Sequence, residues 1–233
     1  MKNLFQQIKG RLVVSCQAES GSPFDSPEGV AMFAQCAVIG GAAAIRTCGI
    51  EKSECLVKYI DLPIIALTKS YFEDGCVLIT GSMVDVDKLA AIGADVIAID
   101  GTFRRRDEQG FTGPEFIREV KSRYTDIIVM ADIATLEEAR ACREAGADCV
   151  STTLCGYTPE TADEAKRGPS LELLRSIVAE MPDYPVISEG RYNTPAEAAE
   201  GIKAGAWAVV VGSAITRPHL ITKWFVDAIT AVK

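Results

Sequence analysis

Eight short runs of β-forming residues recur along the chain, and this recurrence limits the possible folds more than any other feature. The runs start at intervals of roughly 20 to 36 residues, and each is followed by polar residues and a helical pattern, as in parallel βα units. The expected strands are 12–16, 43–46, 63–67, 95–100, 127–132, 149–153, 185–189 and 207–212. No change of composition and no flexible linker interrupts the series, so the sequence predicts one domain over residues 1–233.

The eight runs favour a single (β/α)8 TIM barrel of the α/β class, because a doubly wound sheet usually has about five or six strands. Helix start signals agree with this arrangement. Thr135 with Glu138, and Thr194 with Glu197, have the spacing of a capping box, which satisfies two backbone amides at a helix start. Gly-Ala pairs at 41–42, 93–94, 146–147 and 205–206 stand where a helix would end before the next strand.

The composition indicates a folded protein and narrows its partners. Apolar residues make up 48% of the chain and charged residues 24%, so the chain can bury a large core and keep a polar surface. The net charge of -8 argues against binding to the phosphate backbone of nucleic acid. A small phosphorylated metabolite stays possible, because backbone amides and a few arginines can hold a phosphate locally.

Nothing in the sequence indicates a membrane or a secretory route. Residues 1–11 lack the apolar segment of a signal peptide, and the most apolar stretch, 30–45, is too short to span a bilayer. We therefore expect a cytoplasmic protein with no membrane partner. The eight cysteines include no C-x-x-C pair, so most are expected to be reduced residues of the core.

The sequence also predicts no metal and no cofactor. A single histidine, His219, argues against Ser-His-Asp triads and against zinc sites built from several histidines. Asp100, Asp132 and Glu189 could hold a divalent cation, but nearby cations can balance their charge instead. No glycine-rich dinucleotide fingerprint is present.

Polar residues follow the expected strands at their carboxyl ends, where the active sites of such barrels lie. They are Gln17, Arg46, Lys69, Asp100, Asp132, Thr152 with Thr153, Glu189, and Gly212 with Ser213. Any one of them could be a charge paired across the barrel mouth or a solvated rim residue. Several acids and two cations converging on one mouth would perturb each other's ionisation, which is a feature of catalytic sites. The two longest connections, 70–82 and 154–169, are expected to be loops over this site.

Glycines after the last two expected strands indicate a phosphate site. Gly190 with Arg191, and Gly212 with Ser213, stand where strand gives way to loop, and backbone amides at such places hold phosphate in many barrels. Tight turns also need glycine, so each signal is weak by itself. Arg217, at the start of the final helix, is expected to reach the phosphate.

Three further features have simpler interpretations. The basic run 104–106 precedes two acidic residues and is expected to be a solvated loop with local ion pairs, a role near the phosphate or at a subunit interface being the alternative. Trp207 and Trp224 fall on apolar faces and are expected in the core or at an interface.

The motifs, taken in order, resemble those of a known family over almost the whole chain. They are VSCQA at 14–18, IR at 45–46, Lys69 with Tyr71, DGT at 100–102, MADI at 130–133, TTLCGYT at 152–158, EGR at 189–191 and VGSAITRP at 211–218. On these motifs the chain resembles the N-acetylmannosamine-6-phosphate 2-epimerases of bacterial sialic acid breakdown.

The resemblance implies interconversion of N-acetylmannosamine 6-phosphate and N-acetylglucosamine 6-phosphate, with Lys69 transferring the proton and Glu189 as a second catalytic group. The C2 proton becomes removable once the ring opens to an aldehyde. Substrate contacts are expected from Gln17, Arg46, Asp132, Thr153, Tyr157 and Arg217. The chain departs from the family pattern at Thr47, Cys48, Gly101 and Cys155, none of which is a proposed proton carrier.

Two other functions are compatible with the same residues. A Schiff-base aldolase would also place a lysine such as Lys69 near the end of a barrel strand. A phosphosugar-binding protein without activity would need the phosphate site but not the pairing of Lys69 with Glu189. The sequence allows a homodimer but does not determine the oligomeric state.

Overall fold

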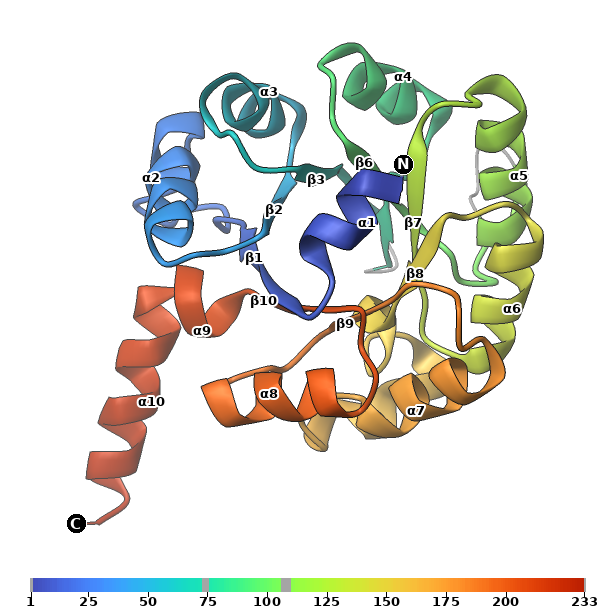
Figure 1. Cartoon of the computed structure of the whole chain (residues 1–233). Coiled ribbons are helices and arrows are strands. Elements are labelled where there is room, and N and C mark those ends of the chain that lie inside the picture. The colour runs from blue at the N-terminus through green and yellow to red at the C-terminus, as the bar shows by residue number, and fades with distance from the viewer. Residues whose placement is uncertain (1, 73–75, 106–109, 233) are drawn as a thin grey trace.

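The computed structural model describes residues 2–72, 76–105 and 110–232. Its centre is a closed barrel of parallel strands in the order β1-β10-β9-β8-β7-β6-β3-β2 (Figure 1). These strands are β1 (Arg11–Cys16), β2 (Ala44–Cys48), β3 (Ile64–Leu67), β6 (Val96–Asp100), β7 (Ile128–Asp132), β8 (Cys149–Ser151), β9 (Val186–Glu189) and β10 (Ala208–Val211). The predicted TIM barrel is confirmed, and the expected strands agree with the observed ones to within two residues at each end.

Helices α2 to α8 surround the barrel in chain order (Figure 1). The helices described are α1 (Lys2–Ile8), α2 (Pro27–Ile39), α3 (Ile50–Tyr59), α4 (Met83–Ala91), α5 (Gly113–Arg123), α6 (Leu136–Glu144), α7 (Leu171–Glu180), α8 (Pro195–Lys203), α9 (Ser213–Thr216) and α10 (Pro218–Thr230), with 3-10 turns η1 (Thr152–Leu154) and η2 (Pro159–Lys166). Both predicted capping boxes form, at Thr135 and Thr194. Glycines with positive φ follow α2, α4, α6 and α8 as predicted. None of the helices described is long and apolar enough to cross a membrane.

Two apolar layers hold the barrel together. One fills its interior and includes Val13, Ile65, Ala98, Met130 and Val210. The other lies between strands and helices and includes Val14, Ile45, Ile97, Phe116 and Leu174. Because successive side chains of a strand point to opposite faces, residues adjacent in sequence serve different layers. Four of the cysteines are buried as expected, whereas Cys36 is exposed and the other three are half-buried.

Helix α1 closes the amino-terminal end of the barrel. Its residues Leu4, Phe5 and Ile8 pack against the interior layer. Trp207, just before β10, donates a hydrogen bond from Nε1 to the carbonyl of Phe5 at 2.7 Å. The core placement expected for Trp207 is therefore confirmed, and the opposite end of the barrel is left for a binding site.

The connection after β3 differs from the expected loop. The strand ends at Leu67, and Lys69 begins an antiparallel hairpin of β4 (Lys69–Tyr71) and β5 (Val77–Ile79). Lys69 therefore follows the barrel strand as expected, but it belongs to a hairpin where the sequence predicts a loop. Two strands of three residues each are too short to give a readable period in the sequence. The connection 154–169 likewise contains the 3-10 turn η2.

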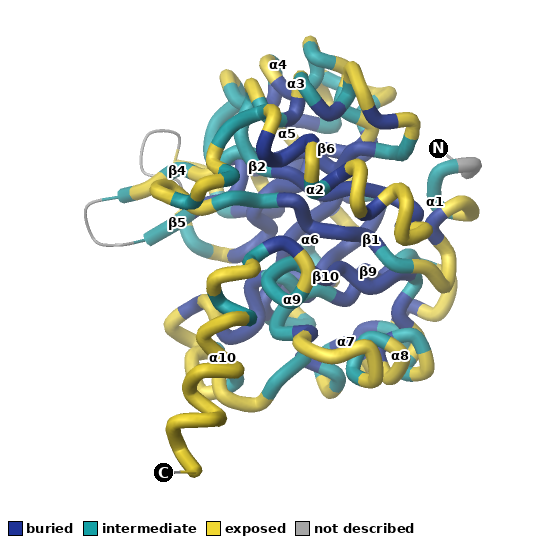
Figure 2. The backbone as a smooth tube through the Cα atoms, turned by 90° about the vertical axis from the view of Figure 1, so that its left-hand side faces the viewer, coloured by how far each residue is buried: buried dark blue, intermediate teal, exposed yellow. Residues whose placement is uncertain are grey.

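Helix α10 extends away from the barrel, and its surface is largely exposed (Figures 1 and 2). Phe225 and Ile229 are 68% and 64% exposed, which is unusual for large apolar side chains. Trp224 is 39% exposed and therefore does not belong to the core of this chain. Its apolar helical face had suggested burial, but only the tertiary packing decides what covers such a face.

Candidate active site

A cavity of about 1250 Å³ lies at the carboxyl ends of the barrel strands. It is lined by eleven of the predicted site residues: Gln17, Arg46, Lys69, Thr153, Tyr157, Glu189, Gly190, Arg191, Gly212, Ser213 and Arg217. Asp132 does not line it, because that side chain is fully buried beneath Arg46. The positions chosen as strand ends thus converge on one mouth, as the barrel topology requires.

Arg46 connects three strands at the base of the cavity. Its side chain, 1% exposed, leaves β2 and pairs with both carboxylate oxygens of Asp132 on β7, at 3.1 and 2.5 Å. Its Nη1 also lies 3.1 Å from Oε2 of Glu189 on β9. The planar guanidinium can satisfy two carboxylates at once, which an ammonium cannot do with the same geometry.

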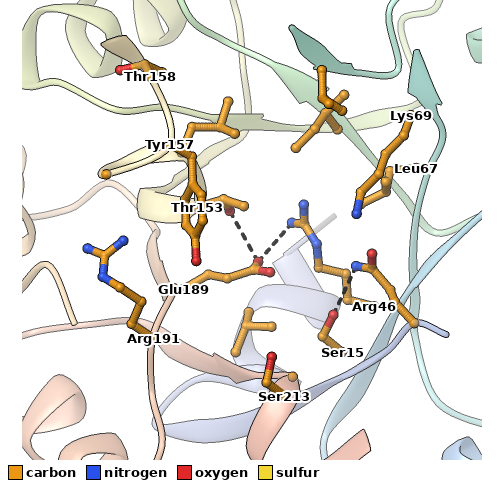
Figure 3. A pocket seen from close by; sticks show the side chains of 18 of the residues that line it. Ser15, Arg46, Leu67, Lys69, Thr153, Tyr157, Thr158, Glu189, Arg191 and Ser213 are labelled. Atoms are coloured by element: carbon orange, nitrogen blue, oxygen red, sulfur yellow. Dashed lines mark hydrogen bonds and ion pairs between the residues drawn. The ribbon is translucent and has the colours of Figure 1, made fainter. Parts of the chain in front are cut away.

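The hydroxyl of Thr153 lies between the two acids. Its Oγ1 is 2.8 Å from Oδ1 of Asp132 and 3.2 Å from Oε2 of Glu189, and it can donate its single proton to one of them at a time. Figure 3 shows Arg46 and Thr153 both pointing at the carboxyl group of Glu189. Thr153 sits in the turn η1 rather than on β8, so the 3-10 turn brings its hydroxyl to the site.

Burial raises the pKa of Glu189 to about 7, because removing a carboxylate from water disfavours its charged form. The guanidinium of Arg46 works against this rise and the charge of Asp132 adds to it. Burial also raises the pKa of Asp132, against the lowering effect of Arg46. Burial alone would lower the pKa of Arg46, but the two carboxylates outweigh it and raise that pKa. Glu189 can therefore exchange a proton near neutral pH while Arg46 keeps its charge.

Lys69 reaches into the cavity from the hairpin. In Figure 3 its amino group points toward the space opposite Glu189, beside Arg46 and Leu67. The side chain is exposed rather than buried in the mouth. Nearby, Gln17 donates from Nε2 to the hydroxyl of Ser15 at 3.0 Å, which fixes the direction of its amide. Cationic and acidic groups thus face each other across a cavity large enough for a sugar phosphate.

The ends of β9 and β10 form the expected phosphate side of the cavity. Gly190 has a φ of 113°, a conformation that favours glycine, and Gly212 precedes the short helix α9. A Cβ on Gly212 would lie 3.3 Å from Cβ of Ser15, so a larger residue would crowd the turn. Arg217 lies at the same edge and is held by Glu19, with 2.7 Å between Nη1 and Oε1.

Arg191 lines the cavity, but its guanidinium is engaged elsewhere. It donates to the carbonyls of Cys155 and Gly168, both at 2.6 Å, and to the hydroxyl of Ser170 at 2.7 Å. These contacts hold the connection after β8, which carries Tyr157 over the cavity. Only the backbone of Arg191 is left for a phosphate, a distinction that the sequence does not make because two of the three partners are backbone carbonyls.

The structure also shows cavity residues that the sequence analysis missed. Tyr71, Phe72 and Trp224 contribute apolar surface to the lining. Arg104, in the basic run, lines the cavity and pairs at 2.7 Å with buried Asp100 on β6, whereas the two acidic residues expected to pair with the run lie outside the described residues. The third arginine of that run lies outside the described residues. Within the described residues, no three His, Cys, Asp or Glu side chains are grouped as a metal site would require.

The fold and the site together define a (β/α)8-barrel enzyme with a basic and an acidic group facing one cavity. Residues 30–231 match the family model described as "Putative N-acetylmannosamine-6-phosphate epimerase". The chain belongs to this family.

Relatives and a solved structure agree with the family assignment. Two relatives bear the name "Putative N-acetylmannosamine-6-phosphate 2-epimerase": one from Caldanaerobacter subterraneus is 44% identical over 97% of this chain and 94% of its own, and one from an Enterobacter species is 41% identical over 99% and 97%. A solved structure of the N-acetylmannosamine-6-phosphate 2-epimerase from Clostridium perfringens is 39% identical, with a TM-score of 0.88 over 97% of this chain and 96% of that one.

Proposed function

We propose that this protein is an isomerase that interconverts N-acetyl-D-mannosamine 6-phosphate and N-acetyl-D-glucosamine 6-phosphate by removing and returning the proton at C2. The reaction belongs to the breakdown of sialic acid and amino sugars. The observation that carries the proposal is the placement of Lys69 and Glu189 on opposite sides of one cavity, with Arg46 between them. The direct test is to let the purified protein act on the sugar phosphate in heavy water and to measure epimerisation and deuterium at C2 of the product.

The roles of the side chains follow from the chemistry of the open-chain sugar. Ring opening gives an aldehyde at C1, which makes the C2 proton acidic enough for removal by a side-chain base. We assign that removal to Lys69. Glu189, with its pKa near 7, supplies or accepts the proton needed for ring opening or at the opposite face of C2. Arg46 stabilises the negative charge that develops on the enediolate oxygen.

Substrate binding is assigned to the remaining residues of the cavity wall. Gln17, Thr153 and Tyr157 would contact the sugar, and Asp132 would act by holding Arg46 and Thr153 in place. Backbone amides at Gly190, Arg191, Gly212 and Ser213 would hold the phosphate together with Arg217. The phosphate would replace Glu19 as the partner of Arg217.

Replacing Arg217 by alanine should raise KM about 10- to 100-fold and change kcat little, because the phosphate is bound equally in the ground and transition states. Steady-state kinetics measure both constants. Lys223→Ala is the control, since that exposed lysine on α10 pairs with Asp227 and should leave KM unchanged. The dephosphorylated sugar should be a very poor substrate, and equal activity on it would contradict the phosphate site.

We also propose that the protein is cytoplasmic.

We further propose that the protein forms a homodimer through α10. A monomer would leave Phe225, Val226 and Ile229 exposed on one helix, and soluble monomers rarely expose such apolar groups together. Light scattering on the purified protein should give twice the chain mass. Phe225→Glu combined with Ile229→Glu should shift it to the monomer, whereas the wild-type protein running as a monomer would refute the proposal.

A further inference from the structure

We infer that Arg104 is a positioning residue for Lys69: it fastens the β4–β5 hairpin, which carries Lys69, to the end of barrel strand β6. The inference rests on the proposed function, because it is the role of Lys69 in proton transfer that makes the position of the hairpin matter. Arg104 belongs to the basic run after β6, and in this role it does not contact the reacting atoms.

The hairpin depends on side chains for its attachment. β4 and β5 form a separate two-stranded sheet, and β4 pairs with β5 rather than with a barrel strand. The base of the hairpin is held by Thr80, whose hydroxyl donates to the carbonyl of Ala98 on β6 at 2.6 Å and accepts from the amide of Thr68 at 3.2 Å. This contact fixes one end of the hairpin and leaves the other end to be held separately.

Arg104 contacts the other end. Its Nη1 lies 3.4 Å from Sγ of Cys76, the residue that directly precedes β5. The carbonyl of Cys76 accepts from the amide of Phe72 at 3.0 Å, just beyond β4, so a contact at Cys76 reaches both strands. Thr80 therefore holds the end of the hairpin next to Lys69, which pairs with Ile79, and Arg104 holds the other end at Cys76.

Arg104 is itself anchored to the barrel. Its Nη2 pairs with Oδ2 of Asp100 at 2.7 Å, and its Nε donates to Oγ1 of Thr102 at 3.0 Å. Thr102 in turn donates to Oδ1 of Asp100 at 2.6 Å. Asp100 is fully buried at the end of β6, so its charge needs a fixed cationic partner. Three nitrogens of one planar group thus meet three different partners, which a lysine cannot reproduce.

Arg104 also balances the charge of Asp100, which lies close to the catalytic network. Asp100 and Asp132 are register partners on β6 and β7, and Asp132 already shares Arg46 with Glu189. With Arg104 in place, each of the two neighbouring strand ends has its own guanidinium. Arg46 can then stay oriented toward Asp132 and Glu189.

The test compares Arg104→Ala with Arg123→Ala. Arg123, the last residue of α5, is exposed, pairs with Asp87 and does not line the cavity. Arg104→Ala should lower kcat about 10- to 100-fold with KM within about threefold, because a displacement of roughly 1 Å at the reacting group costs that much. Arg123→Ala should change neither. Added guanidinium should restore part of the kcat of Arg104→Ala, and a rise in KM at constant kcat would overturn the inference by making Arg104 a substrate contact.

Amide hydrogen exchange tests the attachment without any assay of activity. Amides of β4 and β5 should exchange faster in Arg104→Ala than in the wild type or Arg123→Ala, and those of β1 and β9 should not change. If the alanine variant fails to fold, Arg104→Lys takes its place. The lysine keeps the ion pair with Asp100, and this variant should also lower kcat. An unchanged hairpin would refute the inference, whereas an inactive wild type with a loosened hairpin in Arg104→Ala would refute only the proposed function.

Discussion

Replacing Lys69 by alanine is expected to lower kcat by about 10³- to 10⁴-fold, at the upper end of what a general acid-base group contributes. The reason is that Lys69 is the group assigned to remove the C2 proton. The barrel should stay folded, because Lys69 is exposed on a hairpin outside the barrel and contributes nothing to the two apolar layers. Circular dichroism checks the fold, and steady-state kinetics in a coupled enzyme assay measure kcat.

Isotope exchange tests directly whether Lys69 transfers the proton at C2. The wild type in heavy water should place deuterium at C2 of the product, and Lys69→Ala should not. Lys52→Ala is the matched control, because Lys52 lies in the first turn of α3 and pairs with Asp25 without lining the cavity. Retention of the original hydrogen during wild-type turnover would contradict transfer through a solvent-exchanging lysine. A borohydride-stable adduct at Lys69 would instead support a Schiff-base aldolase.

Replacing Glu189 by glutamine should lower kcat by about 10²- to 10⁴-fold, because the amide cannot exchange a proton. If Glu189 serves only ring opening, the variant should still exchange and epimerise C2 of the small open-chain fraction of the sugar. If Glu189 acts at the opposite face of C2, the original hydrogen is removed by Lys69 but epimerisation stops. Proton nuclear magnetic resonance of the sugar in heavy water distinguishes these two outcomes.

The same substitution should also change the pH dependence of stability. Folding raises the pKa of Glu189 from 4.5 to about 7, so between these values the folded state binds more protons than the unfolded state. Wild-type stability attributable to this group therefore falls as pH rises through this range. Glu189→Gln cannot ionise, so its free energy of unfolding should increase relative to wild type between pH 5 and 8, by at most about 3 kcal/mol.

Denaturant titrations at a series of pH values measure this difference. Glu160→Gln serves as the control, because Glu160 is exposed in η2 and does not line the cavity. A difference for Glu189→Gln that stays constant from pH 5 to 8 would show that burial does not disfavour the charged form of Glu189.

Several features of the site were predictable from the sequence because they depend on local rules. The strand positions follow from short β-forming runs, and the helix ends follow from capping boxes and glycines. Barrel topology then places the residues after each strand at one mouth, which is why Arg46, Lys69 and Glu189 were all named correctly as lining residues. The ordered motifs added the family.

Other features required side-chain directions that no local rule supplies. The pairing of Arg46 with Asp132 joins residues 86 positions apart, and it exists only because the closed barrel brings β2 and β7 face to face across the interior. The hairpin that carries Lys69 was not predicted, because its two strands are very short. The guanidinium contacts of Arg191 and Arg104 were not predicted either, because they include backbone carbonyls for Arg191 and a thiol for Arg104.

The sequence by itself determined the barrel, its order and the set of residues at its mouth, because hydrophobic periodicity, caps and turns act over a few neighbouring residues. The tertiary structure alone decided which charges pair, how far each acid is buried, and that the apolar face of α10 with Trp224 is left exposed. Those properties depend on distances between segments far apart in the chain, and the desolvation that raises the pKa of Glu189 exists only after those segments have packed together.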